Sequence, residues 1–196
     1  MLAFLPNLIT LCRFACVPVF VFFLFQYSVE PGNHLLSSLR TAQAIFVLAS
    51  LSDAIDGVIA RRFKIKSRLG SFLDPLADKA LVLAGFFVLA LLQPPGMPYL
   101  PIWFALLVLF KDSVLVLGVS WARIQKIYME VRPHWTSKVS TFLQMATITA
   151  ALFQIPANWF APMLYLSALL ILTSTLVYFM QGIQLLRARR YTAITN

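Results

Sequence analysis

The chain contains 196 residues, of which 60% are hydrophobic and 12% are charged. A soluble domain carries about 25% charged residues, so this composition disfavours a soluble protein and predicts one membrane-embedded domain over residues 1–196. The formal net charge of +9 does not indicate nucleic-acid binding, because the basic residues lie between apolar stretches and not on a polar face that also exposes aromatic side chains.

Apolar stretches close to the ~20 residues that cross a bilayer recur along the whole chain. In chain order, the predicted membrane helices cover residues 5–26, 39–59, 70–93, 100–121, 139–153 and 160–181. The fifth is the least apolar, because Gln144 and several threonines interrupt it. Prolines are expected to break the chain at 94–101, and Pro156 and Pro162 to do so between the last two helices. The predicted fold class is an all-α integral membrane protein with six transmembrane helices.

Lysine and arginine are distributed unevenly among the connections. The connections at 27–38, 94–99 and 154–159 contain neither residue, whereas those at 61–68 and 123–138 and the C-terminal segment 187–190 are basic. Basic segments next to membrane helices stay in the cytoplasm, which places both termini there and requires an even number of spans. The charge pattern therefore agrees with the six helices expected from hydropathy.

Four of the seven acidic residues fall between positions 53 and 78. An ionised side chain at membrane depth costs about 2.5–3.5 kcal/mol even on a mild scale, so this concentration indicates a functional site. On a helix, two acidic and two small residues share one face in each of two sets. These sets are Asp53, Asp56, Gly57 and Ala60, followed by Gly70, Asp74, Ala77 and Asp78.

The two acidic faces are expected to lie near the same membrane surface, because only the short basic segment 61–68 separates them. Carboxylates that converge within a few ångströms cannot all stay ionised without a counter-charge, and one or two divalent cations would supply it through the oxygen ligands that Mg²⁺ prefers. The sequence therefore predicts a Mg²⁺ or Mn²⁺ site. Its expected ligands are Asp53, Asp56, Asp74 and Asp78.

Small residues and an arginine accompany the acidic pattern. Gly57, Ala60 and Gly70 leave room for a ligand to approach the backbone, and Arg61 offers a planar fork suited to phosphate oxygens. A purely structural alternative for the small residues is close helix packing. That alternative does not account for four carboxylates, which give helix packing nothing that serine or asparagine would not.

The segment 53–78 matches the pattern D-x2-D-G-x2-A-R-x8-G-x3-D-x3-D at every fixed position, and it resembles the signature of the CDP-alcohol phosphotransferase family. The resemblance implies six membrane helices, a homodimer, and an active site at the cytoplasmic face of the membrane, here expected to be the bacterial inner (plasma) membrane. It also implies transfer of a phosphatidyl group from CDP-diacylglycerol to an alcohol, with release of CMP.

The resemblance assigns roles to individual residues. The four aspartates would bind the metal, and Asp78 would also act as the general base that takes the proton of the acceptor hydroxyl. The CDP moiety would be bound by Asp56, Gly57, Ala60, Arg61 and Gly70. The opening segment 5–13 is similar to two branches of the family, which adds Asn7 and Arg13 to the CDP-binding residues. Arg13 could instead snorkel to the membrane surface.

The acceptor alcohol is the open part of this interpretation. One of the two branches uses glycerol 3-phosphate, and the other, the CMP-forming cardiolipin synthases, uses phosphatidylglycerol. Residues 138–144 are similar to a Lys-x2-Thr-x2-Gln stretch found in both. An anionic acceptor such as glycerol 3-phosphate needs a pocket with several cations. Four basic residues of this chain could supply them, which favours glycerol 3-phosphate; they are Lys111, Arg123, Arg132 and Lys138. Lys111-Asp112 stands where the glycerophosphate branch commonly has Arg-Glu, and Arg132-Pro133 resembles the cardiolipin branch.

Three alternatives remain, one to the acceptor-binding role of Lys111 and two to the enzyme. Lys111 and Asp112 could form a structural pair within the membrane. The chain could be a divalent-ion transporter with carboxylates at the bilayer midplane, or a catalytically silent membrane scaffold. Carboxylates that flank a short basic connection favour a site at the membrane surface over a transport path at the centre.

Overall fold

The computed structural model describes residues 4–29, 35–63, 70–124 and 135–194. Side chains are described for Cys12 and for residues 14–29, 36–52, 79–118 and 135–182. Over these ranges the chain forms six α-helices and no strands, as predicted for the fold class. The helices are α1 Phe4–Val29, α2 Leu35–Phe63, α3 Gly70–Leu92, α4 Ile102–Ile124, α5 Trp135–Leu152 and α6 Ala157–Ile194.

Each predicted apolar stretch lies within one helix or overruns it by a residue or two, and the main differences concern α6. This helix continues beyond residue 181 through the basic segment 187–190 to Ile194. The prediction that Pro162 belongs to the preceding connection is wrong, because Pro162 lies inside α6. Pro162 is the sixth residue of this 38-residue helix and removes a single backbone hydrogen bond from it.

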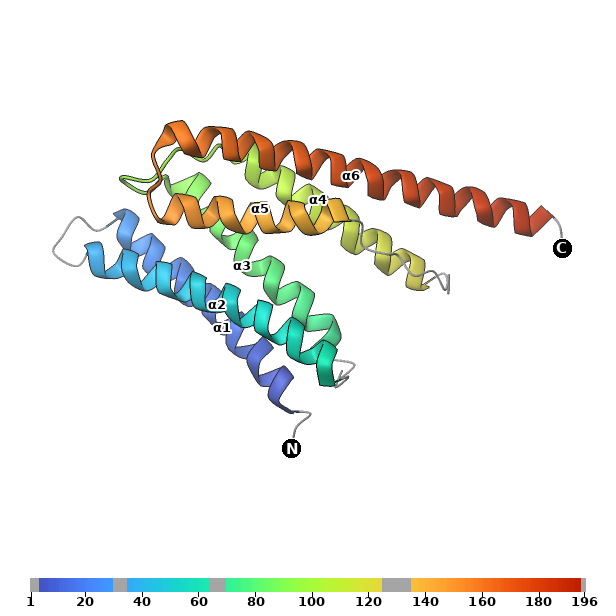
Figure 1. Cartoon of the computed structure of the whole chain (residues 1–196), viewed down its shortest axis with the longest axis horizontal. Helices are drawn as coiled ribbons and strands as arrows, with labels where there is room; N and C mark the ends of the chain where they lie inside the picture. The colour runs from blue at the N-terminus through green and yellow to red at the C-terminus, as the bar shows by residue number, and fades with distance from the viewer. Residues whose placement is uncertain (1–3, 30–34, 64–69, 125–134, 195–196) are drawn as a thin grey trace.

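The helices run back and forth, and α1, α2 and α3 are inclined to α4, α5 and α6 (Figure 1). One end of the bundle holds the C-terminal ends of α1, α3 and α5, together with the connections 93–101 and 153–156. Away from this end, the C-terminal end of α2 lies near the beginning of α1, and the C-terminal ends of α4 and α6 lie apart from them. α1 packs against α2 and α3, α6 packs against α4 and α5, and α3 joins the two groups through contacts with α4 and α5.

Aromatic side chains fill the core between these groups. Phe20, Phe46, Phe86 and Phe104 are fully buried, and the rings of Phe86 and Phe104 meet edge to face with 5.1 Å between centroids. Gly85 lets α3 approach its neighbours, since a Cβ atom at this position would lie 3.3 Å from Ile148 Cδ1. The half of α3 that follows residue 79 is therefore fixed by packing on two sides.

Large apolar side chains also cover the outside of the bundle. Leu166, Leu169, Leu176 and Phe179 of α6 are each more than half exposed. Contiguous apolar surface of this kind is rare on soluble monomers. By length and hydropathy, Ala157–Gly182 is the one stretch of the described residues able to cross a bilayer, and the apolar stretches Phe14–Val29 and Lys79–Leu92 are shorter. Six spans with cytoplasmic termini thus remain a prediction.

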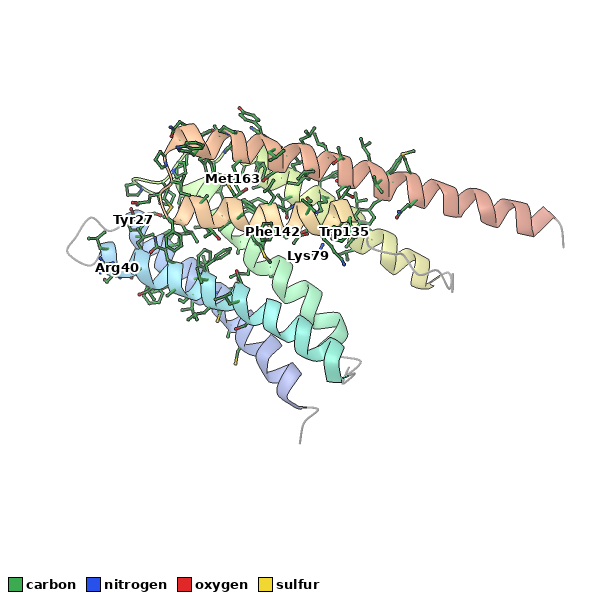
Figure 2. All side chains as sticks on the ribbon, in the orientation of Figure 1. Tyr27, Arg40, Lys79, Trp135, Phe142 and Met163 are labelled. Atoms are coloured by element: carbon green, nitrogen blue, oxygen red, sulfur yellow. The ribbon has the colours of Figure 1, made fainter. Side chains whose placement is uncertain are left out.

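Hydrogen bonds fasten the end of the bundle that holds the connections 93–101 and 153–156. The Tyr27 hydroxyl donates to the Pro95 carbonyl at 2.6 Å and accepts a bond from Gln154 Nε2 at 2.9 Å. Gly96, whose φ is +75°, lets the chain turn beneath this amide, and a Cβ atom at Gly96 would lie 3.0 Å from Gln154 Nε2. One phenol thereby joins α1 to two connections that are distant in sequence (Figure 2).

Tyr27→Phe is expected to lower the free energy of unfolding by about 1–2 kcal/mol, since it removes two hydrogen bonds worth about 1 kcal/mol each. Thermal unfolding of the purified protein in detergent, followed by circular dichroism, measures this change. Tyr99→Phe is the matched control, because Tyr99 lies in the connection 93–101 that Tyr27 contacts and is itself 65% exposed. Equal unfolding temperatures for the two variants would contradict the assigned role of Tyr27.

Candidate active site

The four predicted metal ligands lie on two consecutive helices. Asp53 and Asp56 are in the second half of α2, and Asp74 and Asp78 are in the first half of α3. α2 and α3 contact each other, and the end of α2 lies beside the beginning of α3 (Figure 1). The backbone therefore brings the two acidic segments to the same end of the bundle, as the sequence predicts.

The side chains of the quartet lie outside the described residues, so coordination by them stays a prediction. Among the side chains that the structure describes, no three His, Cys, Asp or Glu residues form a group able to hold a metal ion. The donor set of the quartet fits a hard divalent cation, because its carboxylate oxygens are the ligands that Mg²⁺ and Mn²⁺ prefer.

The predicted CDP-binding residues are distributed over α1, α2 and α3. Asn7 and Arg13 are in α1, Gly57, Ala60 and Arg61 in α2, and Gly70 begins α3. α1 packs against both α2 and α3, which fits a single site lined by the three helices. The contacts that these side chains would make lie outside the described part of the chain.

Polar side chains form a layer inside the bundle between α4, α5 and α6. The buried polar residues of α4, α5 and α6 are Lys111, Asp112, Ser140, Gln144, Thr147, Ser167 and Ser174. Polar groups inside an apolar bundle are costly unless they have partners. The layer therefore needs the specific contacts described next.

An ion pair joins α3 to α4. Lys79 Nζ donates to Asp112 Oδ1 at 2.6 Å, and the two side chains are 24% and 11% exposed. The proposed alternative of a pair between Lys111 and Asp112 is wrong, because Asp112 turns to Lys79. Neighbouring side chains on an α-helix diverge by about 100°, so Lys111 and Asp112 reach different partners.

Lys111 points to α5. It is 2% exposed, and its ammonium donates to Ser140 Oγ at 3.2 Å. Gln144 Nε2 donates to the same oxygen at 3.3 Å. Asp112 and Lys79 both act electrostatically on Lys111, and these three groups together carry one excess positive charge. Among the described side chains, Lys111 has the neutral hydroxyl of Ser140 as its hydrogen-bond partner.

The other predicted acceptor-binding residues are not seen to join Lys111. Lys138, in the first turn of α5, is exposed, whereas Ser140 is fully buried. Arg123 lies near the end of α4 with its side chain outside the described set, and Arg132 lies outside the described residues. Sequence reasoning missed Ser140. The available signal was the helical spacing of Thr136, Ser140, Gln144 and Thr147, which places four polar residues on one face of α5.

An apolar hollow of about 480 Å³ lies between α1 and α3. Four of its lining residues, Phe14, Ala15, Val17 and Pro18, belong to α1, and Ala80 belongs to α3. Ala80 directly follows Lys79 of the ion pair in the sequence of α3.

Comparison with known proteins gives the family. The family model described as CDP-alcohol phosphatidyltransferase matches residues 3–182. A probable phosphatidylglycerophosphate synthase of Mycobacterium tuberculosis is 35% identical over 158 residues, covering 80% of this chain and 68% of that protein. A CDP-diacylglycerol–glycerol-3-phosphate 3-phosphatidyltransferase of Rickettsia bellii is 35% identical, over 74% and 72% of the two chains. A CMP-forming cardiolipin synthase of Rattus norvegicus is 27% identical, over 84% and 55%.

The matched segment contains the whole acidic pattern from Asp53 to Asp78 and the buried polar layer of α4 and α5. The match also extends over nearly the full length of the chain, from α1 into α6. The chain therefore belongs to the CDP-alcohol phosphatidyltransferase family.

Proposed function

We propose that this protein is a membrane enzyme that transfers the phosphatidyl group of CDP-diacylglycerol to glycerol 3-phosphate, forming phosphatidylglycerophosphate and releasing CMP for phospholipid synthesis. The observation that carries the proposal is the complete acidic pattern on the adjoining segments of α2 and α3. Membership of the family and the names of the bacterial relatives support it.

The residues of the chain supply positioning and proton transfer. Asp53, Asp56, Asp74 and Asp78 would hold Mg²⁺ or Mn²⁺, which, when bound, polarises the pyrophosphate and offsets the charge on the departing CMP. Arg61 would bind phosphate oxygens where Gly57, Ala60 and Gly70 leave space. Asp78 takes the proton of the acceptor hydroxyl while the oxygen of that hydroxyl forms a bond to the phosphatidyl phosphorus. The bond from that phosphorus to the CMP oxygen breaks.

The buried charge at Lys111 favours an anionic acceptor. A phosphate group would neutralise the excess positive charge of Lys79, Asp112 and Lys111 and could accept hydrogen bonds from Lys111 and Ser140. Glycerol 3-phosphate carries such a group without hydrocarbon chains. The alternative acceptor is phosphatidylglycerol, which would make the protein a CMP-forming cardiolipin synthase. The similarity to the rat enzyme of that name supports keeping this alternative.

The proposed setting is a bilayer crossed six times, with both termini and the site on the cytoplasmic side and two copies forming a homodimer. The exposed leucines and phenylalanines support contact with lipid, and the hollow between α1 and α3 could receive hydrocarbon of the donor. Acidic segments next to one end of the bundle fit a surface site better than a divalent-ion pathway through the midplane. A silent scaffold would not need four carboxylates.

Purified protein in detergent, supplied with CDP-diacylglycerol and Mg²⁺ or Mn²⁺, is expected to release CMP fastest with glycerol 3-phosphate. The comparison acceptors are phosphatidylglycerol, inositol phosphate and serine, each tested separately. Inverted membrane vesicles test the orientation, since glycerol 3-phosphate added outside them reaches the cytoplasmic face. Release of CMP with none of the acceptors would reject the enzyme and favour the transporter or the scaffold.

Asp78→Asn is expected to lower kcat by at least about 100-fold, because it removes the general base, while CDP-diacylglycerol binding largely persists. Asp53→Asn is expected to act through the metal, raising the Mg²⁺ concentration needed for half-maximal activity. Initial rates over a Mg²⁺ titration separate the two effects. Activity of Asp78→Asn above a few per cent of wild type would exclude Asp78 as the base.

Lys111→Met is expected to raise the KM for glycerol 3-phosphate roughly 10-fold or more, since a hydrogen bond to a charged group is worth about 1.5–3 kcal/mol. The KM for CDP-diacylglycerol should change little. Arg40→Met is the control, because Arg40 is an exposed cation at the opposite end of the bundle (Figure 2). If both KM values rise together, Lys111 supports the fold and does not select the acceptor.

A further inference from the structure

The ion pair between Lys79 and Asp112 lies at a distinctive position in the fold. Lys79 directly follows Asp78 on the uninterrupted helix α3, which runs from Gly70 to Leu92. After Lys79, α3 is held by its packed core residues Leu81, Val82 and Phe86. The pair is therefore the polar contact of α3 that lies nearest to its acidic segment among the described residues.

α4 holds its two neighbours by different side chains. Asp112 binds Lys79 of α3 at 2.6 Å, and Lys111 binds Ser140 of α5 at 3.2 Å. Packing alone tolerates small rotations of a helix, whereas a short charge-assisted hydrogen bond requires a defined geometry. The Lys79–Asp112 contact thereby fixes the rotation of α3 about its axis one residue away from Asp78.

Net stabilisation is a weak explanation for this pair. Removing two charges from water costs several kcal/mol each, and a buried pair often does no better than two well-packed apolar residues. The cost is greater where lipid surrounds the protein. A buried pair that contributes little stability can still select one arrangement of the helices that it joins.

We propose that Asp112 is a positioning residue, which holds Lys79 and so sets the register of the Asp74–Asp78 segment toward its metal ion. This inference rests on the proposed function, because it assumes that Asp74 and Asp78 are metal ligands. It adds a residue from α4 to a site otherwise built from α1, α2 and α3. It also gives Asp112 a role separate from that of Lys111, which is left to bind an anion.

Mn²⁺ binding to the purified protein in detergent, measured by electron paramagnetic resonance, tests the proposal without relying on turnover. Asp112→Asn and Lys79→Met should each weaken Mn²⁺ binding by roughly 10-fold, the scale of losses when a supporting contact of a metal site is removed. The double variant should lose no more than either single variant, since both changes break the same contact.

Lys79→Met is the decisive variant. If the pair acted only through its charges, removing this cation near the carboxylates would strengthen Mn²⁺ binding, and removing the Asp112 charge would weaken it. Positioning predicts weaker binding in both cases. Tighter Mn²⁺ binding by Lys79→Met, or unchanged binding by Asp112→Asn, would overturn the proposal. Lys79→Arg keeps the ion pair and should bind Mn²⁺ within about 3-fold of wild type.

Ser167→Ala controls for a general loss of helix packing. It removes the buried hydrogen bond of 2.9 Å between Thr147 and Ser167 in the other half of the bundle, and it should leave Mn²⁺ binding unchanged. An equal loss in this variant would also refute positioning by Asp112. Wild-type protein that binds Mn²⁺ but releases no CMP would reject the proposed function while leaving the positioning role of Asp112 intact.

Discussion

Charged and polar groups inside this bundle must find their partners within the protein, because the apolar side chains around them and any lipid outside provide none. This constraint explains the arrangement of the interior polar layer. Lys79 and Asp112 neutralise each other across α3 and α4, and Thr147 and Ser167 join α5 to α6. Lys111 donates to the neutral hydroxyl of Ser140, whereas the buried hydroxyls of Thr136 and Ser174 lack a partner within the described residues.

The same constraint gives α4 a central part in the proposed chemistry. The acidic pattern belongs to α2 and α3, but α4 carries both the cation suited to an acceptor phosphate and the carboxylate that holds α3. Lys111 and Asp112 can have these two different roles because consecutive side chains on a helix point to different neighbours. The donor side and the acceptor side of the site would therefore meet across α4, with the metal-binding segment fixed relative to the acceptor.

The sequence alone was sufficient to predict the six helices and to identify the acidic pattern. Hydropathy predicts the apolar segments directly, and the spacing of Asp53, Asp56, Asp74 and Asp78 depends only on local helix geometry. The partner of Asp112 could not be predicted in this way, because a contact between residues 33 positions apart depends on how two helices are rotated in the packed bundle. Ser140 was missed because serine is common on helix faces and becomes distinctive only when a buried ammonium lies against it.

The phenol of Tyr27 has a consequence for how the bundle comes apart. It holds α1, the turn after α3 and the turn after α5 through one shared oxygen, so opening of either turn breaks one of its bonds and movement of α1 breaks both. These segments should therefore melt as one cooperative unit instead of fraying separately. This fastening lies at the end of the bundle remote from the acidic segments of α2 and α3.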